Sequence, residues 1–184
     1  DEFYNKLEGT DVIPSTSAPT VGEGMELIEQ LIEEGYTDVI MYSISYKLSS
    51  IGQMIETLKP EYEDKINIHV VDTKAATYMQ GYLAMHAKEM AQSGSSVEEI
   101  LEKTQYLIEN SHAYFVVDNL QYLVKNGRLT GAQGFLGGLL KIKPLLELDK
   151  EGRIVSKEKI KTHRKAVERG LELLLSEIDE NDKV

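Results

Sequence analysis

The sequence predicts an α/β fold: a mainly parallel sheet flanked by helices, followed by the start of a second α+β domain. In the first two thirds of the chain, short apolar runs alternate with amphipathic helical patterns, which is typical of parallel strands covered by helices on both faces. After Asp149 this alternation gives way to a hairpin pattern. We therefore expect an α/β domain over residues 1–125 and a crossover with a partial second domain over residues 126–184.

The first segments read as a short helix, a loop and a long helix. Residues 2–8 predict a helix that Gly9 ends, and residues 12–20 predict a loop, because two prolines bracket small hydroxyl residues. Thr20, with a glutamate three residues later, forms a capping-box pattern that predicts a helix over residues 21–34.

Two apolar runs predict the first strands of the parallel sheet. Residues 38–44 are nearly all apolar, as expected of a strand that is buried on both faces, and residues 66–72 form the second run. A helix over residues 50–58 follows the first run, and Pro60 is expected to end it. A longer helix, over residues 75–92, follows the second run, with an apolar face of Met79, Tyr82, Leu83, His86 and Met90.

A second capping-box pattern starts at Ser96 and predicts a helix that reaches Glu109. The apolar run at residues 114–117 then predicts a third strand of the same sheet. Further along, residues 150–153 read as the turn of a hairpin between two short extended segments. A final helix is expected from Thr162 or His163 to Glu177, with its inward face formed by Ala166, Val167, Leu171, Leu174 and Leu175.

Between the third strand and the hairpin lies a glycine-rich crossover with an arginine at its start. It contains Gly127, Gly131, Gly134, Gly137 and Gly138, and Arg128 directly follows the first of them. Glycine is costly inside a helix and often marks a close backbone approach, so this segment suits either an anion-binding site or tight packing with a surface arginine.

Composition excludes several classes of function. The 184 residues include 31 acidic and 20 basic side chains, for a net charge of −11, which argues against nucleic-acid binding and against binding to anionic membrane surfaces. No apolar run approaches the roughly 20 residues that span a bilayer, so no stable membrane insertion is expected. The absence of cysteine excludes a disulfide framework and fits a reducing compartment, and we expect a cytoplasmic location.

Hydroxyl and acidic side chains follow the predicted strands, where open α/β sheets bind ligands. Ser49 follows the first strand and could donate a hydrogen bond to a carboxylate or phosphate, or could simply cap the next helix. Thr16 has the same ambiguity between a turn hydroxyl and a ligand donor. Asp72 and Asp118 could form a general-base pair, although acids at strand ends more often cap helices. The histidines show no metal-ligand spacing, so no metal site is predicted.

Five segments in this order and spacing resemble the DegV family, the fatty-acid-binding subunits of bacterial fatty acid kinase. They are PSTSAPT at 14–20, ISYKLSS at 44–50, VVDTKAA at 70–76, YFVVDNLQYLVKNGRL at 114–129 and LLKIKPLLELDKEGRI at 139–154. The family normally has an earlier first strand and a later glycine- and histidine-containing segment, so the resemblance implies that this chain lacks segments at both ends. Ser50 and Asn126 stand where the family has glycine.

The resemblance implies a carrier that is not itself an enzyme and needs no cofactor. Members of the family enclose a long-chain fatty acid in an apolar tunnel between two domains and hydrogen-bond its carboxylate through hydroxyls that match Thr16 and Ser49. They present the carboxylate to a separate ATP-dependent kinase subunit, which forms an acyl phosphate for phospholipid synthesis. Arg128 matches the family arginine and is a candidate for contact with the carboxylate or with the kinase.

Two other functions stay open on the sequence. One is a small-molecule phosphotransferase or hydrolase on a related scaffold, with Asp72 or Asp118 as its base; the absence of a nucleotide-binding motif argues against it. The other is a regulatory interaction domain. A concentration of lysines is either a docking patch for a partner or a solvated face, and comprises residues 141, 143, 157, 159 and 161.

Overall fold

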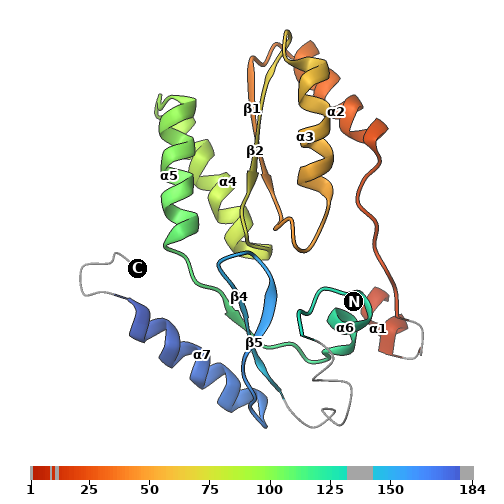
Figure 1. Cartoon of the computed structure of the whole chain (residues 1–184), viewed down its shortest axis with the longest axis vertical. Helices are drawn as coiled ribbons and strands as arrows, with labels where there is room; N and C mark the ends of the chain where they lie inside the picture. Colours follow the sequence, from red (N-terminus) through yellow and green to blue (C-terminus); the bar gives the residue numbers. More distant parts are fainter. Residues whose placement is uncertain (1, 9, 11–12, 132–142, 179–184) are drawn as a thin grey trace.

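A computed structural model describes residues 2–8, 10, 13–131 and 143–178, and it has the predicted α/β fold class. Its strands form two sheets (Figure 1). In the first, β1 (Asp38–Ser43) pairs in parallel with β2 (Asn67–Asp72). The second is antiparallel, in the order β3-β4-β5, and consists of β3 (Tyr114–Phe115), β4 (Leu145–Leu148) and β5 (Ile154–Glu158).

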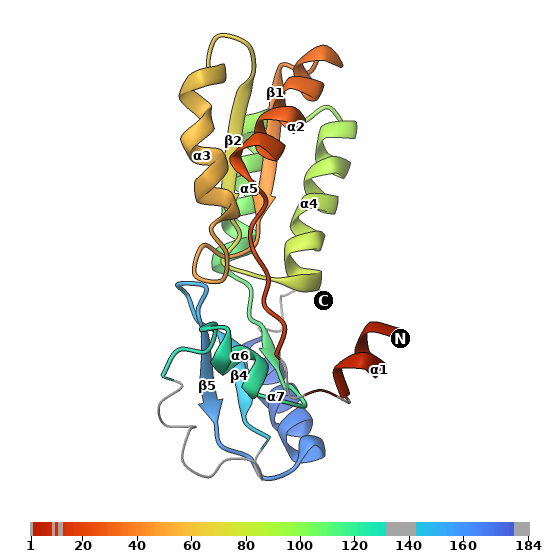
Figure 2. The ribbon, with the colours of Figure 1, turned by 90° about the vertical axis from the view of Figure 1, so that its right-hand side faces the viewer.

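Helices cover both faces of the parallel pair. On one side lie α2 (Val21–Glu33) and α3 (Ile51–Tyr62), and on the other lie α4 (Thr77–Gln92) and α5 (Val97–Glu109), as Figures 1 and 2 show. The main core fills the space between the sheet and the first helix pair, and its buried residues are Ile28, Ile55, Leu58, Tyr62, Ile66 and Ile68. Met25, Leu31 and Ile32 of α2 are partly buried and pack against this core.

Both predicted capping boxes are present. The hydroxyl of Thr20 accepts a hydrogen bond from the backbone N–H of Glu23 at 3.2 Å, and the Glu23 carboxylate accepts one from the N–H of Thr20 at 2.7 Å. Ser96 and Glu99 make the same reciprocal pair at 3.2 and 2.8 Å at the start of α5. Each box satisfies backbone N–H groups that have no partner inside the helix, which fixes where the helix begins.

The prediction that Pro60 ends its helix is wrong, because α3 continues through it to Tyr62. Proline removes one backbone hydrogen bond and disfavours the helical conformation of the preceding residue. Here tertiary packing outweighs that cost, since Ile55, Leu58 and Tyr62 lie on one helical face and all three are at most 6% exposed in the main core.

The run at 114–117 does not form a third strand of the parallel sheet. Only Tyr114–Phe115 is a strand, and it pairs antiparallel with β4 in the second sheet. An apolar run of this length does not specify its sheet, and Phe115 and Val117 pack against the cluster of Leu129, Leu146 and Ile154. Helices cover both faces of β1, as expected. Its side chains are nevertheless only half-buried before the buried Ser43, and in the described part of the chain β1 has β2 as its one neighbour in the sheet.

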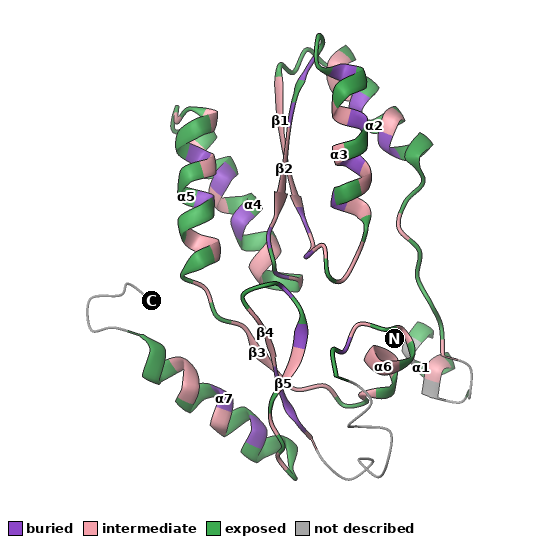
Figure 3. Cartoon of the chain, in the orientation of Figure 1, coloured by how far each residue is buried: buried purple, intermediate pink, exposed green. Residues whose placement is uncertain are grey.

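The final helix, α7 (His163–Glu177), has its predicted bounds but a different buried face. Ala166 and Gly170 are buried, and the small Gly170 lies against Leu145 and Tyr114, so the helix approaches the second sheet closely along these two residues. Three of the residues predicted to face inward are exposed: Val167, Leu171 and Leu175, at 41%, 56% and 71%. Much of the α7 ribbon is accordingly green, the colour of exposed residues, in Figure 3. Tyr82 of α4, also predicted on an apolar face, is 38% exposed.

Two shorter helices complete the structure: α1 (Glu2–Glu8) and α6 (Gln121–Lys125). The glycine-rich crossover is described only as far as Gly131, so the predicted role of Gly134, Gly137 and Gly138 lies outside the described residues. The division into domains at residues 125 and 126 stays a prediction.

Asp149 organises the turn between β4 and β5, and its carboxylate is the basis of a pH prediction. The carboxylate accepts hydrogen bonds from the N–H groups of Glu151 and Arg153 at 3.0 and 2.9 Å and from Nε of Arg153 at 2.8 Å. Burial raises the pKa of Asp149, but the hydrogen bonds from Arg153 and Glu151 outweigh burial and leave that pKa below its ordinary value.

A carboxyl group with a lowered pKa in the folded state stabilises the fold fully above its unfolded pKa of about 3.9, and this contribution disappears as pH falls below that value. We therefore expect Asp149→Asn to lose less unfolding free energy than the wild type between about pH 5 and pH 3 in urea titrations. Asp64→Asn, at an exposed position, is the control and should follow the wild type. An acid response of Asp149→Asn equal to that of the wild type would contradict the assignment.

Candidate ligand-binding site

The turn that carries Ser49 connects β1 to α3 and is organised by Ser45. Ser45 is fully buried, and its carbonyl oxygen accepts hydrogen bonds from the N–H groups of Leu48 and Ser49 at 2.9 and 3.1 Å. Its Oγ also accepts a hydrogen bond from the N–H of Lys47 at 3.1 Å. The Ser49 backbone is thus held in place by a residue four positions earlier.

The hydroxyl of Ser49 is available as a donor. Its Oγ accepts a hydrogen bond from the N–H of Ile51, the first residue of α3, at 3.4 Å, and no residue in the described part of the chain accepts its proton. The cap position of α3 belongs to the neighbouring Ser50, whose side chain makes no capping bond. Ser49 is half-buried, which suits a group that meets a ligand beside the helix start.

Thr16 lies in the extended segment between α1 and α2, and its side chain is exposed. In the described residues no hydrogen bond joins it to Ser49 or Arg128. Its loop is nevertheless linked to the segment that holds Arg128, because Nδ2 of Asn126 donates a hydrogen bond to the carbonyl oxygen of Pro14 at 3.3 Å.

Arg128 lies beside the Ser49 turn. Its Nε donates a hydrogen bond to the carbonyl oxygen of Leu48 at 3.3 Å, and Nη1 donates one to the carbonyl oxygen of Asn126 at 2.7 Å. None of the ion pairs among the described residues involves it, so its charge is not matched by an acidic side chain there. The residue is half-buried, and its interpretation as a salt-bridged surface arginine is not supported.

Residues 126–128 therefore bridge the two loops that carry the predicted carboxylate ligands. Asn126 contacts the loop of Thr16, and Arg128 contacts the turn of Ser49. The left-handed conformation in this bridge is at Gly127, whose φ is +68°, whereas Asn126 has a φ of −87°. Beneath the bridge lies an apolar cluster in which the buried Leu129, Leu146 and Ile154 contact the half-buried side chains of Leu48, Phe115, Val117, Leu120, Leu123, Val124 and Leu148.

The two acids proposed as a general-base pair have separate structural surroundings. Oδ1 of Asp72 accepts hydrogen bonds from the N–H groups of Tyr46 and Lys74 at 3.2 and 3.0 Å, so this carboxylate ties together the loops after β1 and β2. Asp118 follows a strand of the other sheet, and its side chain is 95% exposed next to Lys143. The structure does not bring the two together as a catalytic pair.

Tyr46 adds a further polar group to the turn. Burial, followed by the nearby carboxylates of Glu56 and Asp72, raises the pKa of Tyr46 above its ordinary value. The phenol therefore stays neutral over the physiological range. Its ring lies next to Gly52 of α3, where an added Cβ would collide with Cε1 of the ring.

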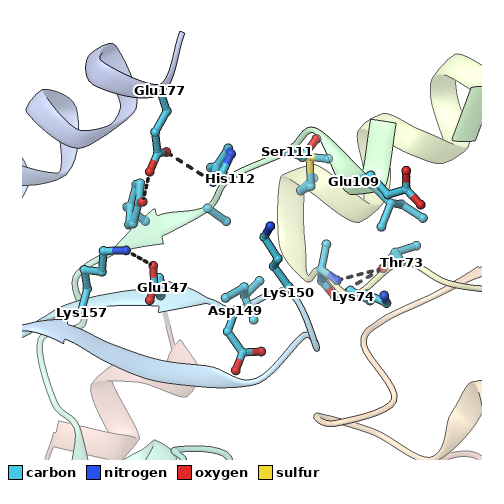
Figure 4. Close-up of a pocket in the computed structure, with 16 residues that line it drawn as sticks. Thr73, Lys74, Glu109, Ser111, His112, Glu147, Asp149, Lys150, Lys157 and Glu177 are labelled. Carbon is cyan, nitrogen blue, oxygen red and sulfur yellow. Dashed lines mark hydrogen bonds and ion pairs between the residues drawn. The ribbon is translucent and has the colours of Figure 1, made fainter. Parts of the chain in front are cut away.

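A cavity of about 600 Å³, with both polar and apolar lining residues, lies where the ends of α5 and β2 meet the second sheet and α7 (Figure 4). Its charged walls are largely paired: Lys157 with Glu147 at 2.9 Å, and Glu177 with His112 at 3.3 Å. Burial and the hydrogen bond to Glu177 raise the pKa of Tyr114 in the same wall. Thr16, Ser49 and Arg128 are not among the residues that line this cavity.

Within the residues that the structure describes, no group of three or more His, Asp or Glu side chains is placed to hold a metal ion. None of the described helices combines the length and apolar character needed to cross a membrane.

The sequence interpretation missed two residues of the site. Ser45 lies within the segment at 44–50, but its burial and its bonds to the turn were not predicted. Asn126 was noted as a replacement for glycine, and its side chain proves to hold the loop of Thr16. Each acts through a contact with a distant or backbone group that no local pattern specifies.

The fold and this loop cluster define an α/β protein with a site of hydroxyl and guanidinium donors beside an apolar cluster. A sequence model described as "uncharacterised protein, DegV family" matches residues 1–184. The chain therefore belongs to the DegV family. A DegV domain-containing protein of Staphylococcus aureus is 36% identical over 168 residues, which are 91% of this chain and 58% of that protein.

Solved structures of DegV family proteins have the same fold. A fatty-acid-binding DegV family protein from Streptococcus agalactiae has a TM-score of 0.90 at 35% identity, over 98% of this chain and 64% of that one. DegV from Bacillus subtilis, described as a fatty-acid-binding protein, has a TM-score of 0.83 at 35% identity, over 95% of this chain and 61% of that one. The chain thus spans about 60% of the length of these relatives.

Proposed function

We propose that this protein binds a long-chain fatty acid and presents its carboxylate to a separate, ATP-dependent kinase subunit. In this proposal the hydroxyls of Thr16 and Ser49 donate hydrogen bonds to the carboxylate, and Arg128 lies at the edge of the same site. The acyl chain occupies an apolar tunnel that begins at the cluster beneath the bridge. The kinase then forms an acyl phosphate that can enter phospholipid synthesis.

The observation that carries the proposal is the convergence of three predicted segments. The loop of Thr16 and the turn of Ser49 are both bonded to residues 126–128, although all three segments are far apart in the sequence. Next to a cluster of apolar side chains lie the hydroxyl of Ser49 and the guanidinium of Arg128, which has no acidic partner among the described residues. An anionic headgroup with an apolar tail matches this combination of surroundings.

The physical chemistry of the headgroup supports hydroxyl donors. A carboxylate at an apolar boundary needs hydrogen bonds, because leaving it unpaired there costs several kcal/mol. Hydroxyl groups supply these bonds while leaving one carboxylate oxygen accessible to an incoming phosphoryl group. Each buried methylene of the tail contributes roughly 0.8 kcal/mol, so the length of the tail should dominate the affinity.

The surroundings of the acids favour a carrier over an enzyme. Asp72 uses its carboxylate to hold two backbone N–H groups, and Asp118 is exposed in another part of the structure. A general base must lie within hydrogen-bond reach of the group that it deprotonates, and the bonds of Asp72 to backbone N–H groups give it a structural role instead.

A phosphoryl-transfer assay tests the carrier role. We expect the purified protein, loaded with a fatty acid and given ATP and Mg²⁺, to form neither ADP nor acyl phosphate. Addition of a separate fatty acid kinase subunit should yield acyl phosphate, trapped with hydroxylamine as the hydroxamate. ATP hydrolysis by the protein alone, lost in Asp72→Asn, would instead favour an enzyme of the phosphotransferase or hydrolase class.

A further inference from the structure

We infer that the turn of the β4–β5 hairpin, residues 149–153, positions the hydroxyl of Ser49 by acting through Ser45. Ser45 and Gly152 are then positioning residues of the carboxylate site, although neither touches the ligand. The inference rests on the proposed function and adds to it a mechanical link between the two sheets.

Ser45 joins the two parts of this link. Its Oγ donates a hydrogen bond to the carbonyl oxygen of Gly152 at 2.8 Å across 107 residues of sequence. The same Oγ accepts from the N–H of Lys47, and the Ser45 carbonyl accepts from the N–H of Ser49. A displacement of the hairpin turn is therefore transmitted to the backbone that carries Ser49 through one fully buried side chain.

Gly152 fits this contact because it has no side chain. It is buried with a φ of +78°, a conformation that other residues adopt only at a cost. A Cβ atom there would collide with Oγ of Ser45 and would lie 2.9 Å from Cα of Lys74. The backbone of the hairpin turn therefore packs directly against the residues that follow both parallel strands, with no room for a side chain between them.

The same contact also fixes the loop after β2. The N–H of Ser45 donates to the carbonyl oxygen of Ala75 at 2.9 Å, and Asp72 bonds to the N–H groups of Tyr46 and Lys74. The hairpin turn consequently packs against the carboxyl ends of the parallel strands, where α/β sheets bind ligands. A purely structural contact would stabilise the fold without setting the orientation of Ser49.

The ratio of two affinities separates positioning from general stability. Oleic acid and methyl oleate share the tail, but only the acid presents a carboxylate to Ser49. Both ligands should be titrated into the full-length wild-type protein, Ser45→Ala and Gly152→Ala. We expect the preference for the acid to fall by about tenfold in both variants, the effect of disturbing a hydrogen bond to a charged group, while the affinity for the ester changes little.

Gly94→Ala is the matched control for Gly152→Ala. Gly94 has a φ of +89°, so alanine brings a similar backbone strain, but no atom lies within 4 Å of its added Cβ. This variant should keep the wild-type preference for the acid. If Gly152→Ala does not fold, Ser45→Ala decides the question, since it removes the hydroxyl without adding an atom.

The outcomes distinguish this inference from the proposed function. A wild-type protein that binds neither ligand, or binds both equally, contradicts the proposed function and removes the basis of the inference. A wild-type preference for the acid that depends on Ser49 but is unchanged in Ser45→Ala and Gly152→Ala overturns the inference alone. An equal loss of affinity for both ligands in these variants also overturns the inference, because a merely structural contact would give that result.

Discussion

Replacing both hydroxyl donors, in Thr16→Ala/Ser49→Ala, is expected to weaken the binding of a long-chain fatty acid by about a hundredfold. A hydrogen bond to a charged group contributes roughly 1.5–3 kcal/mol, so loss of two such bonds from a carboxylate lowers affinity by at least that factor. The affinity can be measured by displacement of a fluorescent fatty acid at constant pH and ionic strength.

The neighbouring pair Ser15→Ala/Ser50→Ala provides the control for this experiment. Both serines are exposed, and Ser50 makes no side-chain bond at the start of α3. The control should bind with wild-type affinity. If the Thr16/Ser49 variant also bound like the wild type while remaining folded, the carboxylate would have to lie elsewhere in the protein.

Gly52→Ala is expected to cause a large loss of stability. The new Cβ would collide with the ring of Tyr46 and lie 2.6 Å from Oγ of Ser43, in a buried position under the turn of Ser49. Overpacking of this kind costs about 1–3 kcal/mol, and relief by moving Tyr46 would also disturb the turn. Urea unfolding measures the loss directly.

Gly81→Ala is the opposite case on another helix. Gly81 is exposed in α4, and no atom lies within 4 Å of an added Cβ, so the methyl group meets open space. Alanine is a better helix former than glycine, and the variant should gain about 0.5–1 kcal/mol of unfolding free energy. A destabilised Gly81→Ala, or an unaffected Gly52→Ala, would show that packing at these positions has been misjudged.

The sequence predicted those elements whose causes are local. Thr20 and Ser96 begin helices because each has a glutamate three residues later, and the hairpin after β4 follows from its turn residues. The end of α3 was mispredicted because the cost of Pro60 is local, whereas the compensating burial of Tyr62 is tertiary. The same holds for α7, where contact along Ala166 and Gly170 determines the buried face.

In the candidate site, too, the local features were predictable and the long-range contacts were not. The resemblance of short segments to a family located Thr16, Ser49 and Arg128, and the structure shows that their segments converge. The contacts that join them were not predictable: Asn126 bonds to Pro14 across 112 residues, and Ser45 bonds to Gly152 across 107. Such pairs leave no periodic pattern or motif in the sequence, because the positions meet only after both sheets have formed.

Mass spectrometry of the ligand carried by the intact purified protein tests the central claim most directly. Organic extraction followed by mass analysis, together with native mass spectrometry of the unextracted protein, should show one long-chain fatty acid per chain. The Thr16→Ala/Ser49→Ala variant should appear in native mass spectra largely without bound lipid. Recovery of phosphate, a sugar or no ligand from the intact wild-type protein, with no uptake of added fatty acid, would contradict the account.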